Sequence, residues 1–117
     1  MNQKEQANDI RGNFLRNKAK DLIGGLSFRY SPSFEKFCTN VVGELQSEEL
    51  KNGSMDSQIK KDAIYQILDV RLNNENNIEV EPLIKVIQED LEREQSYLIV
   101  KARAIQLLQK LSDFQAL

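Results

Sequence analysis

The sequence predicts an all-α fold, a single domain of four to five antiparallel helices. A chain of 117 residues has the usual length of one domain. It contains only two prolines, so few positions would interrupt a helix. Apolar residues recur three and four positions apart along most of the chain, which is typical of amphipathic helices. No segment shows the sustained alternation of apolar and polar residues that is typical of strands.

We expect the first helix over residues 5–23. Its apolar residues share one stripe, at Ile10, Phe14, Leu15, Ala19, Leu22, Ile23 and Leu26. Gly24 and Gly25 follow this stripe, and glycine commonly ends a helix because it tolerates a positive φ. The stretch 28–33 then indicates a connector.

A helical hairpin is expected over residues 33–72. The serine and proline at 31–32 indicate its start, because serine caps helices and proline suits the first helical turn. The stretch 51–54, Lys-Asn-Gly-Ser, indicates the turn between its two helices. The second helix should begin near residues 54–56, where a short polar side chain can accept the first amide hydrogens.

The second half of the chain leaves one question open. The stretch 73–78 is mostly polar and is expected to be an exposed loop. Residues 79–114 form either a second hairpin or one long helix, because 92–96 is polar but lacks glycine and proline. Apolar residues nearly surround the last segment, from Leu98 to Phe114. We therefore expect the last helix to be central and packed on two sides.

Displacing the sequence by 41 residues aligns the two halves, so that Ile64 falls on Ile105. Residues 82–87 and 100–108 resemble one unit of the HEAT and armadillo repeat proteins. In that class, pairs of helices stack on one another to build a continuous core. The resemblance covers residues 34–114 and implies a short HEAT-like stack of helical hairpins. An ordinary bundle of four or five helices is the alternative, because any two amphipathic hairpins share some apolar positions.

The composition argues against catalysis. The chain has no histidine and a single cysteine, which excludes Ser-His and Cys-His catalysis and an intrachain disulfide. Cys38 itself is expected in the core. The carboxylates at 48–49 and 89–90 are expected to be solvated, because adjacent residues on a helix diverge by about 100°. We find no metal-binding, cofactor-binding or catalytic motif, and we expect a protein that is not an enzyme.

Two sets of residues are candidates for binding a partner. Basic residues occupy similar places in the two predicted hairpins and define a basic strip, formed by Lys60, Lys61, Lys101 and Arg103. The strip would suit an acidic partner or a phosphate backbone; ordinary solubilising charges are the alternative, since phosphate binding needs several clustered cations. Phe28 and Tyr30 form the second set, because aromatic residues are enriched at interfaces. Packing of these aromatic side chains in the core is the alternative for this set.

These observations favour a non-catalytic protein–protein interaction module, such as an adaptor, an inhibitor, an immunity-type protein or an assembly subunit. A small helical subunit associated with nucleic acid through the basic strip is one alternative. However, 16 basic against 18 acidic residues, a net charge of −2, do not make the whole chain a polycation. A homo-oligomeric bundle is the other alternative. No apolar run has the length of a membrane span or of a signal peptide core, so we expect a soluble, cytoplasmic protein without a membrane partner.

Overall fold

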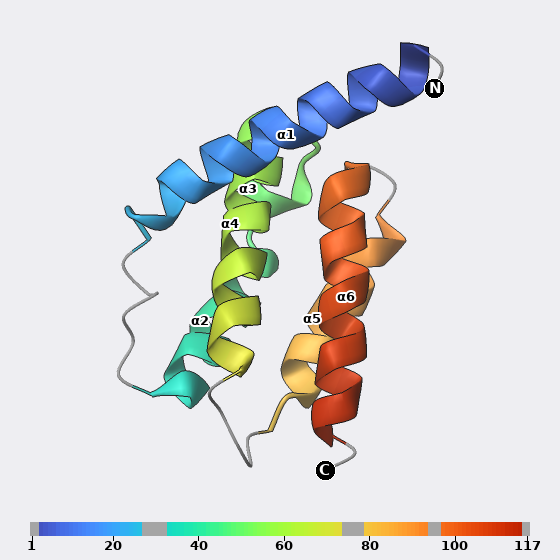
Figure 1. Cartoon of the computed structure of the whole chain (residues 1–117). Helices are drawn as coiled ribbons and strands as arrows, with labels where there is room; N and C mark the ends of the chain where they lie inside the picture. The colour runs from blue at the N-terminus through green and yellow to red at the C-terminus, as the bar shows by residue number, and fades with distance from the viewer. Residues whose placement is uncertain (1–2, 27–32, 74–78, 94–96, 116–117) are drawn as a thin grey trace.

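The computed structural model describes residues 3–26, 33–73, 79–93 and 97–115. These residues form six helices and no strand (Figure 1). The helices are α1 (Gln3–Ile23), α2 (Phe34–Leu45), α3 (Glu48–Lys51), α4 (Met55–Leu72), α5 (Glu81–Glu92) and α6 (Leu98–Gln115). The all-α prediction is confirmed. The predicted count of four to five helices is too low, because α3 is a separate helical turn between α2 and α4.

Serine caps mark the starts of α2 and α4. The Ser33 hydroxyl accepts a hydrogen bond from the Lys36 amide at 3.1 Å, and Ser54 accepts one from the Ser57 amide at 3.2 Å. Each cap satisfies one of the amide groups that have no partner in the first turn of a helix. The start of α4 agrees with the prediction, whereas the start signal at 31–32 lies outside the described residues.

α1 ends at Ile23, directly before the two glycines, as the sequence predicts. Neither Gly24 nor Gly25 has the positive φ that was expected of them. Instead, the Gly25 amide donates to the Leu22 carbonyl at 2.9 Å, which satisfies a carbonyl group at the helix end. The helix therefore stops without a left-handed residue.

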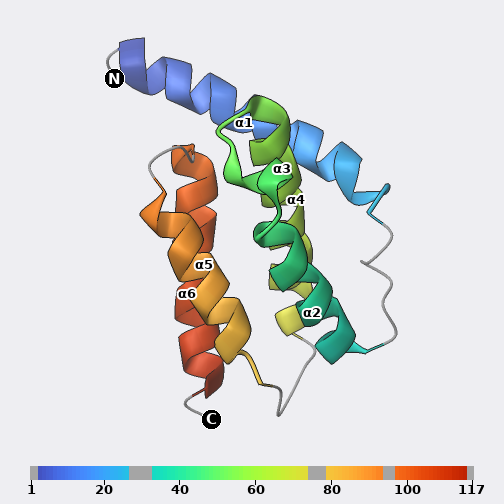
Figure 2. The ribbon, with the colours of Figure 1, turned by 180° about the vertical axis from the view of Figure 1, so that it is seen from behind.

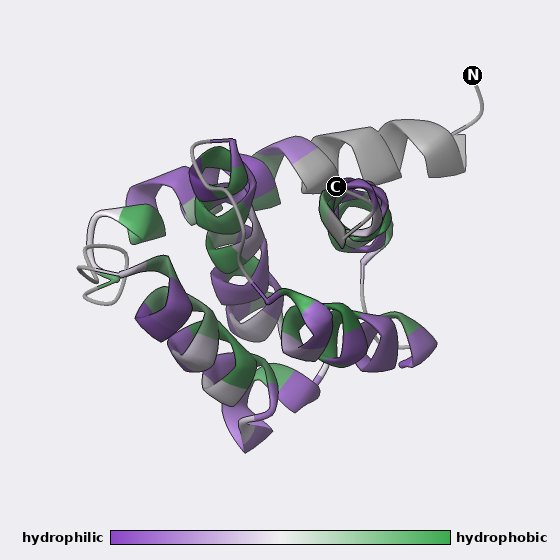
Figure 3. Cartoon of the chain, turned by 90° about the horizontal axis from the view of Figure 1, so that it is seen from below, coloured by the Kyte–Doolittle hydropathy of each residue, from purple (hydrophilic) through white to green (hydrophobic). Residues whose placement is uncertain are grey.

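The four longer helices of the hairpins form two layers. α4 and α6 run parallel to each other in one layer, and α2 and α5 run in the opposite direction in the other (Figures 1 and 2). α1 crosses over α4 on the side away from α2 and α5 (Figure 3). Residues 79–114 thus contain two helices, α5 and α6, rather than one long helix.

The central helix is α4, which contradicts the expectation that the last helix would be central. α4 contacts α1, α2, α3 and α6, and ten of its 18 residues are buried. α6 does pack on two sides, against α4 and α5, but it lies at the edge and leaves Leu98 and Ile105 68% and 58% exposed. The expectation of a central last helix was wrong because it counted apolar residues alone, whereas α4 also buries charged residues by pairing them with its neighbours.

The 41-residue offset has a counterpart at the interface of α4 and α6. Arg103 donates to Asp62 at 2.9 Å, and Lys110 donates to Asp69 at 3.0 Å, so both pairs join residues 41 positions apart. However, the aligned residues Ile64 and Ile105 differ in environment, at 0% and 58% exposure. The HEAT-like repeat therefore stays a prediction, as does the bundle that is its alternative.

The hydrophobic core lies around α4. It includes Leu15 and Ala19 of α1, Phe37 of α2, and Val100 and Leu111 of α6. Among the helices of the described ranges, none combines the length and apolar character needed to cross a membrane.

Candidate functional site

Two residues of the predicted basic strip form ion pairs with buried carboxylates of neighbouring helices. Lys61 is only 2% exposed, and its ammonium group lies 2.7 Å from the carboxylate of Asp90. Arg103 is 19% exposed at its side chain and lies 2.9 Å from the fully buried carboxylate of Asp62. Contrary to the expected surface strip, Lys61 is not presented to a partner.

The other two residues of the strip lie nearer the surface. Lys60 pairs with Glu44 at 3.1 Å and with Glu49 at 3.4 Å. Burial lowers the pKa of Lys60, but the two carboxylates raise it by more, so the pKa lies above its ordinary value. Lys101 is partly exposed on α6. The structure therefore does not bring the four basic side chains together as one exposed surface.

The aromatic candidates Phe28 and Tyr30 lie outside the described residues. Two further aromatic residues lie on α2. Phe34 and Phe37 are 5% and 0% exposed, and their ring centroids lie 5.7 Å apart in a stacked arrangement. The Arg71 guanidinium of α4 lies over the Phe37 ring, 4.6 Å from its centroid. These contacts hold α2 against the last part of α4, and Phe34 and Phe37 belong to the core.

Asp90 on α5 was expected to be solvated, but it is 2% exposed. Its carboxylate accepts hydrogen bonds from Lys61 at 2.7 Å, from the Tyr65 hydroxyl at 2.8 Å and from Arg93 at 3.3 Å. Burial of Tyr65, together with the charge of Asp90 and the hydrogen bond to it, raises the pKa of the phenol well above its ordinary value. This buried network fixes α5 against α4.

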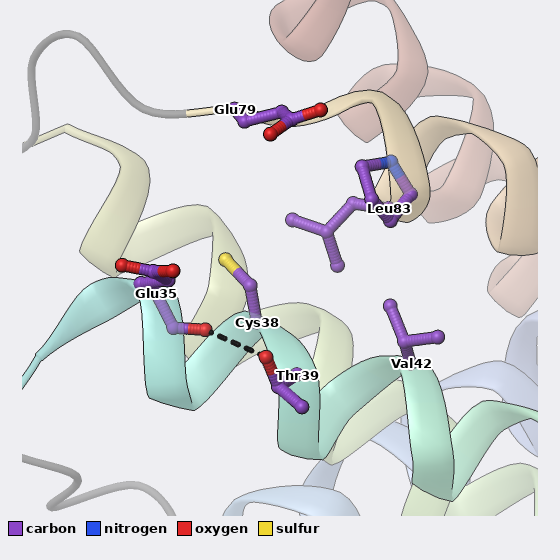
Figure 4. Close-up of a pocket in the computed structure, with 7 residues that line it drawn as sticks. Glu35, Cys38, Thr39, Val42, Glu79 and Leu83 are labelled. Atoms are coloured by element: carbon purple, nitrogen blue, oxygen red, sulfur yellow. Dashed lines mark hydrogen bonds between the residues drawn. The ribbon is translucent and has the colours of Figure 1, made fainter.

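A pocket of about 480 Å³ lies between α2 and the start of α5 (Figure 4). This volume is in the range of pockets that bind small molecules. We call it the α2–α5 pocket, and its lining residues are Glu35, Cys38, Thr39, Val42, Glu79, Pro82 and Leu83. The α2 residues reach it together because positions three and four apart share one face of a helix.

The two ends of the α2–α5 pocket differ in polarity. The side chains of Glu35 and Glu79 lie toward one end, Val42 and Leu83 lie toward the other, and the Cys38 sulfur lies between them (Figure 4). Leu83 is fully buried and Cys38 is 8% exposed, whereas both glutamates are exposed. Within the described ranges, neither glutamate forms an ion pair with a lysine or an arginine.

Sequence reasoning did not find this pocket, because its walls come from two helices far apart in the chain. The only available signal was the 41-residue offset, which aligns Val42 with Leu83, and both residues line the pocket. Within the described part of the chain, no three cysteine or acidic side chains are placed to hold a metal ion.

Comparisons with protein families, with curated proteins and with solved structures found no match to this chain. The role of the α2–α5 pocket must therefore be inferred from its own residues. It combines apolar lining residues with two exposed carboxylates, and its walls are held by the core on one side and by the Asp90 network on the other.

Proposed function

We propose that this protein is a non-catalytic protein–protein interaction module, and that the α2–α5 pocket receives a side chain of its partner. One observation carries the proposal. The pocket combines a buried apolar floor with two exposed carboxylates that have no ion-pair partner among the described residues. Protein interfaces typically draw most of their binding energy from a few side chains that fill such pockets.

The contacts that hold the pocket walls in place support this proposal. α2 is held to α4 through Phe34, Phe37 and Arg71, and α5 is held to α4 through Asp90 and Lys61. A pocket whose walls are already in place loses little conformational entropy when a partner binds. The buried charges therefore contribute to binding indirectly, by positioning α5.

The other functions receive less support. Association with nucleic acid depended on the basic strip, and Lys60, Lys61 and Arg103 form ion pairs within the chain. A homo-oligomeric bundle stays a prediction, and the exposed Leu98 and Ile105 of α6 form the surface on which to test it. A cytoplasmic location and a HEAT-like stacking of the hairpins also stay proposals.

A change of bulk at the pocket tests the proposed function. Thr39 is exposed in the pocket wall, so Thr39→Trp adds bulk at the edge of the pocket without altering charge. The matched control is Ser112→Trp, which adds the same side chain at an exposed position of α6. Tagged forms of the three proteins are used to capture partners from a lysate of the source cell at near-physiological salt, followed by quantitative mass spectrometry.

We expect the natural chain and Ser112→Trp to capture the same partner, and Thr39→Trp to recover about tenfold less of it, since one blocked anchor removes on the order of 1.4 kcal/mol or more. Equal recovery by Thr39→Trp would place the partner elsewhere on the molecule. Recovery of no partner by the natural chain, together with a strictly monomeric mass, would contradict the module itself. Urea unfolding of both variants shows whether they are folded.

A further inference from the structure

We infer that the α2–α5 pocket is selective for a lysine or arginine side chain of the partner protein. This inference rests on the proposed function, because it specifies which side chain the pocket receives. It follows from the two ends of the pocket and from the charges that surround it.

The apolar end suits the aliphatic part of such a side chain. Val42 and Leu83 form this end, and the Cys38 sulfur continues it toward the glutamates (Figure 4). The methylene groups of lysine and arginine pack along apolar surface while their charged heads remain at a polar boundary. A short aliphatic or aromatic side chain would fill the apolar end alone and leave the two carboxylates without a ligand.

The acidic end suits the charged head. Glu35 comes from α2 and Glu79 precedes α5, so two separate elements supply the two carboxylates. A single exposed ion pair contributes little, but two carboxylates that line the same pocket both favour a positive charge within it. Lys36 and Lys85 lie on the same helices, but neither of them lines the pocket.

The same charges disfavour an anionic ligand. A carboxylate or a phosphate in the pocket would lie beside Glu35 and Glu79, and like charges in close contact repel each other. The two negative charges therefore determine the sign of the partner's charge, and the apolar end determines that this charge is carried on an aliphatic stem.

The thiol of Cys38 offers a direct test, because it lines the pocket and is the only thiol in the chain. The intact protein is treated with cystamine, which carries ammonium groups, or with 3,3′-dithiodipropionate, which carries carboxylates. In each reaction the Cys38 thiolate attacks one sulfur of the reagent, forms a mixed disulfide and releases one thiol. Intact mass spectrometry measures both rates. Each rate is divided by the rate at which the same reagent reacts with N-acetylcysteine amide, because the two reagents release thiols of different pKa and therefore differ in intrinsic reactivity.

We expect the normalised rate to be about tenfold higher for the cationic reagent than for the anionic one, a ratio that corresponds to roughly 1.4 kcal/mol. The ratio should fall to about threefold or less in the double variant Glu35→Gln and Glu79→Gln, in line with the modest energy of exposed charges. The double variant Glu48→Gln and Glu92→Gln is the matched control, because it removes the same number of charges at exposed positions outside the pocket. This control should keep the ratio.

A ratio near one in the natural chain overturns the inference. So does an equal fall in both double variants, because the preference would then reflect net charge alone. If Cys38 reacts with neither reagent, NMR titration with N-acetyl-arginine amide decides. Shifts at Val42 and Leu83 that disappear in the Glu35→Gln and Glu79→Gln variant support the inference, and no shift at either residue overturns it.

The capture experiment separates this inference from the proposed function. If Thr39→Trp loses the partner while Glu35→Gln with Glu79→Gln retains it, the pocket binds a partner but not through a cationic side chain. If Thr39→Trp retains the partner, the proposed function fails, and a cationic preference at Cys38 then describes a pocket that this partner does not use.

Discussion

α4 and α6 are both 18 residues long and lie parallel in one layer. They nevertheless differ in burial, because α4 is the central helix and α6 lies at the edge. α4 is central and buries Lys61 and Asp62. α6 has the more apolar sequence but lies at the edge, with Leu98 and Ile105 exposed. The difference shows that apolar content alone did not decide which helix became central. Side chains of opposite charge on the neighbouring helices also contributed, because they pair with the charged residues that α4 buries.

The two buried charges of α4 are adjacent in the sequence and point to different neighbours. Side chains of consecutive helical residues diverge by about 100°, so Lys61 reaches Asp90 of α5 while Asp62 reaches Arg103 of α6. Removing two charges from water is costly, and only close geometry with further hydrogen bonds offsets the cost. α4 can be central because α5 and α6 both supply the opposite charge.

The largest effect should come from Asp90→Ala. This change leaves the buried Lys61 ammonium without the carboxylate at 2.7 Å and removes the acceptor of Tyr65. We expect the free energy of unfolding, measured in urea, to fall by about 3–5 kcal/mol. The control is Asp113→Ala on α6, whose carboxylate is exposed, and it should change stability by less than about 0.5 kcal/mol. Equal effects would contradict the contrast between the helices.

Two isoleucines test the difference in burial between α4 and α6 by substitutions that change no charge. Ile64 of α4 is fully buried, and Ile105, 41 positions later on α6, is 58% exposed. Ile64→Ala should therefore destabilise the protein by about 2–5 kcal/mol through a cavity and lost burial, whereas Ile105→Ala should cost less than about 1 kcal/mol. Thermal and urea unfolding of both variants measure the difference. A large loss for Ile105→Ala in a protein that sediments as a dimer would instead support the homo-oligomer.

Tyr65→Phe should have an intermediate effect that depends on pH. At pH 7 it removes the hydrogen bond to the buried Asp90 carboxylate and should cost about 2 kcal/mol. The folded-state pKa of Tyr65 is raised above the ordinary 10.0, so above pH 10 ionisation of this tyrosine favours the unfolded chain. The natural protein should therefore lose stability as pH rises past 10, and its advantage over the variant should shrink there. Urea unfolding from pH 7 to 11 checks this, and a constant difference would exclude the phenol as its source.

The smallest effect should come from the outer ion pair of α4 and α6. Asp69 and Lys110 are 46% and 32% exposed at their side chains, so Lys110→Met should change stability by only about 0–1 kcal/mol. The effect should also diminish as salt is added, because exposed charges are screened. Asp62→Asn, at the buried pair with Arg103, should cost more and depend less on salt. Equal salt dependence in the two variants would contradict the difference in burial.

Part of the candidate site could be anticipated from the sequence. Cys38 was expected to be buried, and it is; the 41-residue offset aligned Val42 with Leu83, which share the pocket. The role of Glu35 and Glu79 was not found, because nothing local to either glutamate indicates that the other lines the same pocket. The predicted basic strip instead contains residues that pair within the fold, since spacing along a helix does not show which charges find a partner.

The sequence by itself determined the all-α class and most helix boundaries, because caps such as Ser54, prolines and helical periodicity act within a few residues. Tertiary structure alone decided that α4 is central, that Asp90 is buried and that α2 and α5 enclose a pocket. These outcomes depend on contacts between residues 25, 29 and 41 positions apart. Such contacts form only when helices pack, and the free energy of a buried charge depends on the partner that packing brings to it.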